Sequence, residues 1–163
     1  MKKLILLSAV SIVISAIIGL LIHEFIGHGL TCLLLGGKVN SFGFLTNGNV
    51  GYISISGLTG WKNGIVLLMG TLSTLILSAL ILLFRKVNVF LWWFGFLQPF
   101  DFIMYALTGA AGLRHWIIIG GVGEPQRALN LLGVPTWTAV IFALIALVLP
   151  YLYLRRFKEL QHN

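Results

Sequence analysis

Apolar residues run along this chain in four long stretches, separated by short polar or glycine-rich connections. A helix that crosses a membrane needs about 20 predominantly apolar residues, and each stretch comes close to or exceeds that length. The pattern therefore predicts four transmembrane helices, at residues 4–35, about 63–84, about 87–113 and about 136–154. The first stretch is longer than one crossing requires, so we expect its helix to be tilted, to protrude or to be partly covered by the others.

The connection at residues 38–57 has a different pattern. Phe42 and Phe44 precede Asn47-Gly48, and Ile53 and Ile55 follow it, in two short and partly alternating runs. Asn-Gly between two such runs is typical of a β-hairpin. The expected fold class is therefore an all-α membrane protein with about four transmembrane helices and a short β-hairpin after the first helix. The connection at residues 116–135 is too short and glycine-rich to span again, and we expect a re-entrant or interfacial segment there.

The composition agrees with a membrane location. Hydrophobic residues make up 58% of the 163 residues and charged residues only 9%, whereas a soluble domain carries about 25% charged residues. We expect a single multi-pass integral membrane domain over residues 1–163, without room for a second, soluble domain. The net charge of +7 comes from basic residues scattered in ones and twos. This favours loops at a bilayer surface and argues against nucleic-acid binding.

Two of the four acidic residues, Glu24 and Asp101, fall inside apolar stretches, while Glu124 lies in the last connection and Glu159 in the tail. Ionisable groups at membrane depth are costly and usually face a cavity or one another. At about 1.5 Å of rise per helical residue, His23 lies roughly 30 Å and Asp101 roughly 21 Å from the amino-terminal side of the membrane. Both belong to the far half of the membrane, so we expect these side chains to converge.

The sequence HEFIGH, from His23 to His28, is close to the zinc-protease motif H-E-x-x-H but has one residue more. Histidines four apart on an α-helix point about 40° apart, whereas histidines five apart point about 140° apart, which is too wide for one tetrahedral ion. A π-bulge would restore a common face, and Gly27 makes that distortion easier. Two alternatives stay open: Glu24 and His28 form the ligand pair, or no metal binds.

The segment LLIHEFIGHGLTCLLLGGKVNSFGF resembles the first motif of the site-2 protease family of intramembrane zinc metalloproteases. FLQPFDF, from Phe96 to Phe102, resembles the family's second motif, and GVGEPQRALNLLGVP resembles the last connection of small bacterial members that lack a PDZ or other soluble domain. The resemblance implies that His23, His28 and Asp101 bind Zn²⁺. It also implies that Glu24 is the catalytic base and that the chain resides in a bacterial cell membrane.

The function expected from this resemblance is hydrolysis of peptide bonds in or near transmembrane segments of membrane proteins, with the bilayer and the substrate as partners. Water must then reach the site, and Gln98 and Asn63 are candidates for lining its path. Substrate-binding residues and oligomeric state are not predicted. Two other functions remain open, namely an inactive protein of the same fold that binds metal or a partner helix, and an ion or proton carrier.

The orientation in the membrane is ambiguous from the sequence. Seven basic residues lie on the amino-terminal side of the expected helices and four on the opposite side, which favours a cytoplasmic amino terminus. The family resemblance implies the reverse, with the site toward the cytosol, and we slightly favour that orientation.

Overall fold

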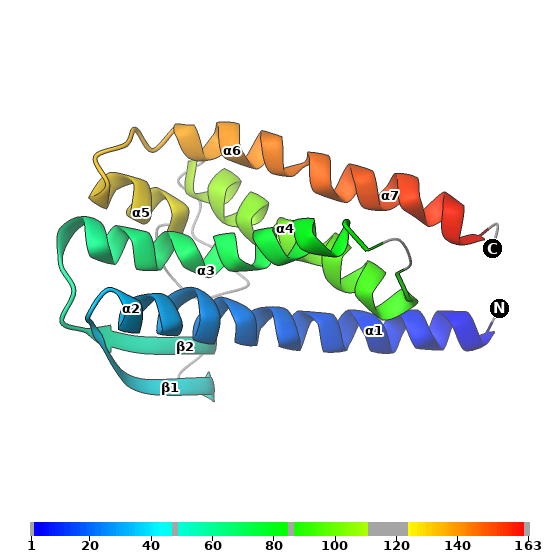
Figure 1. Cartoon of the computed structure of the whole chain (residues 1–163), viewed down its shortest axis with the longest axis horizontal. Coiled ribbons are helices and arrows are strands. Elements are labelled where there is room, and N and C mark those ends of the chain that lie inside the picture. Colours follow the sequence, from blue (N-terminus) through cyan, green and yellow to red (C-terminus); the bar gives the residue numbers. More distant parts are fainter. Residues whose placement is uncertain (1, 47–48, 85–86, 111–123, 162–163) are drawn as a thin grey trace.

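The computed structural model describes residues 2–46, 49–84, 87–110 and 124–161, as a helical bundle with a two-stranded antiparallel hairpin beside the first helix (Figure 1). In chain order the elements are α1 (Lys2–Leu21), η1 (Ile22–Leu30), α2 (Thr31–Leu34), β1 (Lys38–Thr46), β2 (Asn49–Ser56), α3 (Gly60–Ile81), α4 (Val89–Ala110), α5 (Glu124–Leu131), α6 (Thr138–Ala146) and α7 (Val148–Gln161). The first three form one continuous helix, and its amino terminus lies at the same end of the bundle as the carboxyl terminus (Figure 1).

Four helical segments are long and apolar enough to cross a membrane: Ile5–Leu34, Gly60–Ile81, Val89–Leu107 and Thr138–Phe157. They coincide with the four stretches expected from the sequence, and the architecture is compatible with a multi-pass membrane protein. The last segment comprises α6 and α7, which are separated at Leu147. Pro150 explains the separation, because it has no N–H to donate to the carbonyl of Ala146 one turn earlier.

The β-hairpin follows the first helix, as the alternating pattern predicted. Gly36 adopts a φ of +86°, which ends the helix, and β1 then pairs with β2 in a register that joins Lys38 to Ser56 and Phe44 to Gly51. Asn47-Gly48, the expected turn, lies outside the described residues. The hairpin contacts η1 through β2, so it lies beside the part of the first helix that carries the HEFIGH motif.

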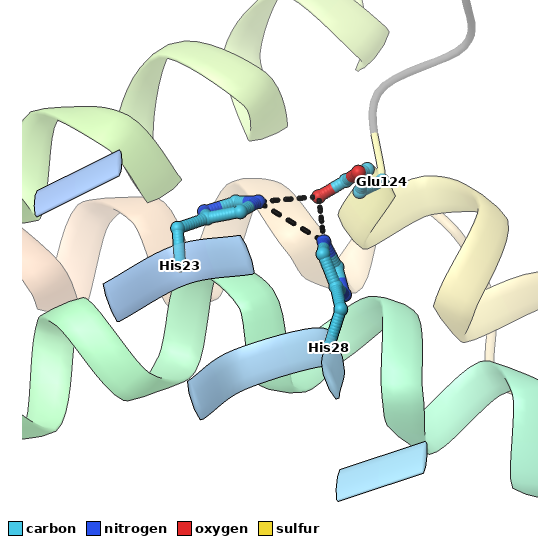
Figure 2. Close-up of side chains that lie close together, drawn as sticks. All are labelled: His23, His28 and Glu124. Atoms are coloured by element: carbon cyan, nitrogen blue, oxygen red, sulfur yellow. Dashed lines mark hydrogen bonds and ion pairs between the residues drawn. The ribbon is translucent and has the colours of Figure 1, made fainter. Parts of the chain in front are cut away.

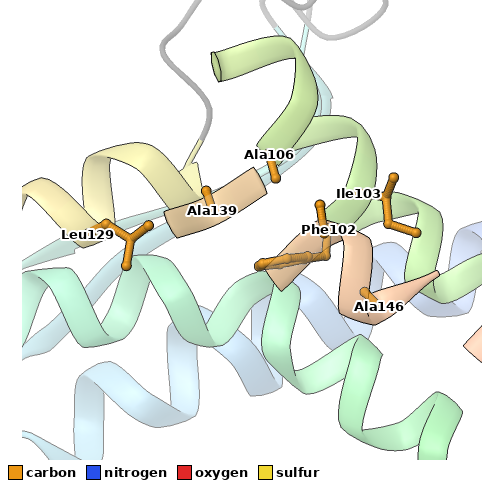
Figure 3. Packing of buried hydrophobic residues seen from close by; sticks show 7 residues of the cluster. Phe102, Ile103, Ala106, Leu129, Ala139 and Ala146 are labelled. Carbon is orange, nitrogen blue, oxygen red and sulfur yellow. The ribbon is translucent and has the colours of Figure 1, made fainter. Parts of the chain in front are cut away.

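Part of the last connection forms the short helix α5; residues 116–123 lie outside the described part of the chain, so the expected re-entrant segment remains a prediction. A buried apolar cluster joins α5 to α4 and α6 (Figure 3). Its members are Phe102, Ile103, Ala106, Leu129, Ala139, Ala143 and Ala146. The amide of Gln126 also donates to the carbonyl of Ala106. These contacts fix α5 against the bundle and thereby position Glu124, its first residue.

Pro99 lies inside α4. Pro99 leaves the carbonyl of Gly95 without its helical N–H partner, and the hydroxyl of Ser78 on α3 donates to that oxygen at 2.6 Å. Pro99 therefore serves the contact between α3 and α4 at this point.

Candidate metal centre

A π-helical segment, η1, carries both histidines of the HEFIGH motif. Its hydrogen bonds close at the fifth residue, so residues five apart take the place that residues four apart hold in an α-helix. The Nε2 atoms of His23 and His28 consequently lie 3.1 Å apart, with their rings in an edge-on arrangement. The π-bulge expected from the sequence is therefore confirmed.

Glu124 completes a buried group of three (Figure 2). Its Oε2 atom lies 3.1 Å from Nε2 of His23 and 3.3 Å from Nε2 of His28. The two histidines are almost fully buried, and a quarter of the glutamate side chain is exposed. Three atoms that are able to coordinate a metal ion thus meet at one point between the first helix and α5.

The other ring nitrogen of each histidine already has a partner. Nδ1 of His23 lies 2.8 Å from Oδ2 of Asp101, and Nδ1 of His28 lies 2.8 Å from the backbone carbonyl oxygen of Val66. Both oxygens accept hydrogen bonds, so each Nδ1 carries the proton and donates it. In the neutral imidazoles each Nε2 is then a bare acceptor with a lone pair, facing the other Nε2 and the carboxylate.

The charge of Glu124 follows from the same neighbours. Burial alone would raise the pKa of its carboxyl, but an imidazole of His23 or His28 that carries an added proton on Nε2 donates a hydrogen bond to the carboxylate and attracts it, which holds that pKa well below its usual range. The carboxyl is therefore negative at neutral pH. Two buried imidazole acceptors and a largely buried carboxylate face one another, and a metal ion or an added proton can supply the positive charge that this arrangement favours.

The spacing fits a small tetrahedral metal ion. Zinc bonds nitrogen and oxygen at about 2.0–2.2 Å, and the tetrahedral angle then places neighbouring ligand atoms roughly 3.3–3.5 Å apart. The three observed separations of 3.1, 3.1 and 3.3 Å lie close to this value. Two histidines and one glutamate are also a known donor set of catalytic zinc, in which the fourth position stays open. The residues present fit a metal ion.

The structure brings together the four residues expected at the site, namely His23, Glu24, His28 and Asp101. Not all of them lie where the expected ligand set requires. His23 and His28 meet at Nε2, whereas Asp101 lies on the Nδ1 side of His23, away from the point where the three acceptors converge. Glu124 occupies the place that the resemblance gave to Asp101. Sequence reasoning placed Glu124 in the last connection without a role in the site; that it is one of only four acids in so apolar a chain was the signal available.

Glu24 is buried beside the group and accepts a hydrogen bond from the backbone of Ile53 on β2. It also lines a cavity of about 350 Å³ between the first helix, α4 and the hairpin. Polar lining residues are His23, Glu24, Gln98, Asp101 and Tyr105, and the remaining lining is apolar or glycine. Gln98 thus lines a space beside the site, as expected, whereas Asn63 is not among the described residues that line it.

Two glycines allow η1 and α3 to approach closely at the site. A Cβ atom on Gly70 of α3 would lie within 2.8 Å of ring atoms of both His23 and His28. A Cβ on Gly27 would overlap the backbone of Met69 and Gly70. Real Cβ atoms do not approach other atoms so closely, so glycine at both positions is what lets the histidine rings lie against α3.

A scan against protein-family models finds no matching family, and searches of the curated proteins and of the solved structures find no significant match.

Proposed function

We propose that this chain is an intramembrane zinc metalloprotease that hydrolyses peptide bonds in or near transmembrane segments. The observation that carries the proposal is the convergence of two bare imidazole nitrogens and one carboxylate oxygen within 3.3 Å. Their partners at Asp101 and Val66 direct the lone pairs toward one point. An arrangement of acceptors alone is unfavourable until a cation joins it.

Zinc suits the reaction because it polarises a carbonyl group and lowers the pKa of a water molecule to about 7. In this assignment His23, His28 and Glu124 are the ligands, and Asp101 is a positioning residue that fixes the tautomer of His23. Glu24, beside His23 in the sequence and on the wall of the same cavity, takes the proton of the attacking water and passes it to the leaving amine.

The substrate class follows from the position of the site. The ligand helix and α4 are among the four segments suited to cross a membrane, so a polypeptide that reaches the cavity comes from a membrane protein or its immediate flanks. A substrate helix must unwind first, because helical carbonyls are already hydrogen-bonded and shielded. The bacterial cell membrane as the location rests on the motif resemblance alone.

Elemental analysis of the detergent-purified chain tests the proposal. We expect about one zinc per chain, its loss in His28→Ala and Glu124→Ala, and full retention in Glu159→Gln, a control that exchanges an acid near the carboxyl terminus. Glu24→Gln should retain zinc but lose cleavage of fluorescently labelled single-span proteins in liposomes. Absence of zinc after incubation with ZnCl₂ at neutral pH would contradict the proposal and leave a proton as the bridging charge. Zinc without cleavage of any protein in the panel would favour an inactive metal-binding protein.

A further inference from the structure

The cavity beside the site extends further than the chemistry described so far requires. It runs between the first helix and α4, from His23 and Glu24 back to Ile12. Ile12 precedes His23 by eleven residues, which corresponds to roughly 16 Å along a helix. The proposed ligand His23 and the proposed base lie at one end only, so the rest of the cavity is open to another part of a substrate.

The first helix lines the cavity with a single face. Ile12, Ala16, Gly19 and His23 follow one another at intervals of three or four residues, and residues so spaced share one side of a helix. The lining residues of α4 recur at similar intervals. The cavity is therefore bounded by two helix faces that lie opposite each other, and it continues directly from the metal centre.

Gln98 closes the cavity on one side. Its buried side chain crosses from α4 to the first helix, where its amide donates to the carbonyl of Ser15 at 3.2 Å. A Cβ atom on Gly19 would overlap that amide, so glycine at this position lets Gln98 lie against the first helix. Ala16, three residues before Gly19, is exposed. The cavity thus has a floor at Gln98 and an open side at Ala16.

The lining changes from polar to apolar along the cavity. His23, Glu24 and Asp101 lie at the site, whereas Ile12 of the first helix and Leu97 of α4 line the part further from it. The backbone of both helices is already hydrogen-bonded there, so a substrate N–H or C=O would find no partner among the described lining residues. An apolar side chain is the part of a substrate that this end binds favourably.

We propose that the apolar end of the cavity binds a large apolar side chain, that of leucine, methionine or phenylalanine, from a substrate residue next to the cleaved bond. This inference rests on the proposed function and adds a substrate preference to it. Ala16 and Leu97 set the size of the side chain that fits, because one is a small residue and the other a large one on opposite walls. In a hydrophobic pocket a single methylene group changes specificity about 10- to 200-fold.

Peptide hydroxamates that differ only in the side chain next to the zinc-binding group test this inference. The parent chain should bind the leucine and phenylalanine compounds at least tenfold more tightly than the alanine compound. Ala16→Phe fills the cavity and should abolish that preference, whereas Leu97→Ala enlarges it and should shift the preference from leucine to phenylalanine. Ala9→Phe is the matched control, because Ala9 is exposed on the same helix and is not among the lining residues; it should keep the parent preference.

The outcomes separate this inference from the proposed function. All four chains should bind about one zinc, because none of the exchanged residues is a proposed ligand. Equal affinity of the parent chain for the three compounds would overturn the inference alone. So would an equal loss for all three compounds in Ala16→Phe, which would indicate a path for water, or an unchanged preference in both cavity variants. A parent chain that binds neither zinc nor any hydroxamate would overturn both proposals.

Discussion

Buried polar groups are paired differently at the two ends of the bundle. At the end that holds the chain termini, donors and acceptors match. The hydroxyl of Tyr153 donates to the carbonyl of Ser78, the hydroxyl of Ser78 donates to the carbonyl of Gly95, and the indole of Trp92 donates to the carbonyl of Tyr153. Ser78 belongs to the last turn of α3, where helical carbonyls lack N–H partners, so the network completes a helix end inside the bundle.

At the other end the N–H donors of the two histidines already have partners. The Nδ1 protons of His23 and His28 go to Asp101 and to the carbonyl of Val66, which leaves two nitrogens and the Glu124 carboxylate facing each other. Buried polar groups in folded proteins are nearly always satisfied, and acceptors that face one another in this way are able to share a metal ion or an added proton. A network in which donors and acceptors pair stabilises the fold, whereas acceptors that converge are able to hold a cation.

A glycine at each end provides the strongest way to test this contrast. Gly70 leaves room for the rings of His23 and His28, and Gly95 leaves room for the phenol of Tyr153. In Gly70→Ala the new methyl group would push the two imidazoles apart. We expect metal affinity to fall more than about 100-fold, beyond the range of typical outer-shell changes, as measured by competition with a fluorescent zinc chelator.

Gly95→Ala is the matched control at the other end, because its methyl group would overlap the Tyr153 phenol. Overpacking of this kind costs about 1–3 kcal/mol of stability, so the melting temperature should fall while the zinc content stays the same. Zinc affinity that is unchanged in Gly70→Ala, or lost equally in both variants, would contradict the assignment of different roles to the two ends.

The fold was largely predictable because its signals are local. Apolar length gave the four spans, and Asn47-Gly48 between alternating runs gave the hairpin. The π-bulge was also predictable, since HEFIGH has one residue more than the zinc motif and Gly27 relieves the crowding. Each of these inferences needs only neighbouring residues in the chain.

The place of Glu124, the proposed third ligand, was not predictable in this way. Glu124 reaches the histidines because Leu129 and Gln126 fix α5 against α4 and α6, and no short-range pattern encodes that docking. Asp101 was expected to be a ligand because it is an acid inside an apolar stretch and because FLQPFDF resembles the family's second motif. Depth along the helix predicted correctly that Asp101 approaches His23, but it does not predict which ring nitrogen the carboxylate meets.

Asp101→Asn tests whether Asp101 supports His23 through Nδ1 or binds the metal itself. Its expected effect is the second largest. The asparagine side chain still accepts a hydrogen bond from Nδ1 of His23 but carries no charge, so the tautomer persists with weaker support. We expect zinc affinity to fall about 10- to 100-fold, as for other outer partners of metal-bound histidine, with about one zinc per chain still bound at saturation. Complete loss of zinc in Asp101→Asn, with retention in Glu124→Gln, would instead make Asp101 the third ligand.

Tyr153→Phe is expected to have the smallest effect, and it tests only the end of the bundle that holds the chain termini. The change removes the hydroxyl that donates to the carbonyl of Ser78 in the last turn of α3. Both residues are buried, so that carbonyl loses its hydroxyl partner away from solvent. An unsatisfied buried acceptor costs about 1–3 kcal/mol, so the melting temperature in detergent should fall by a few degrees. Zinc content and zinc affinity should not change, because the Ser78 network shares no hydrogen bond with His23, His28 or Glu124 among the described contacts. A loss of zinc affinity in this variant would mean that the two ends are coupled through α3, which carries Val66 and Gly70 at one end and Ser78 at the other.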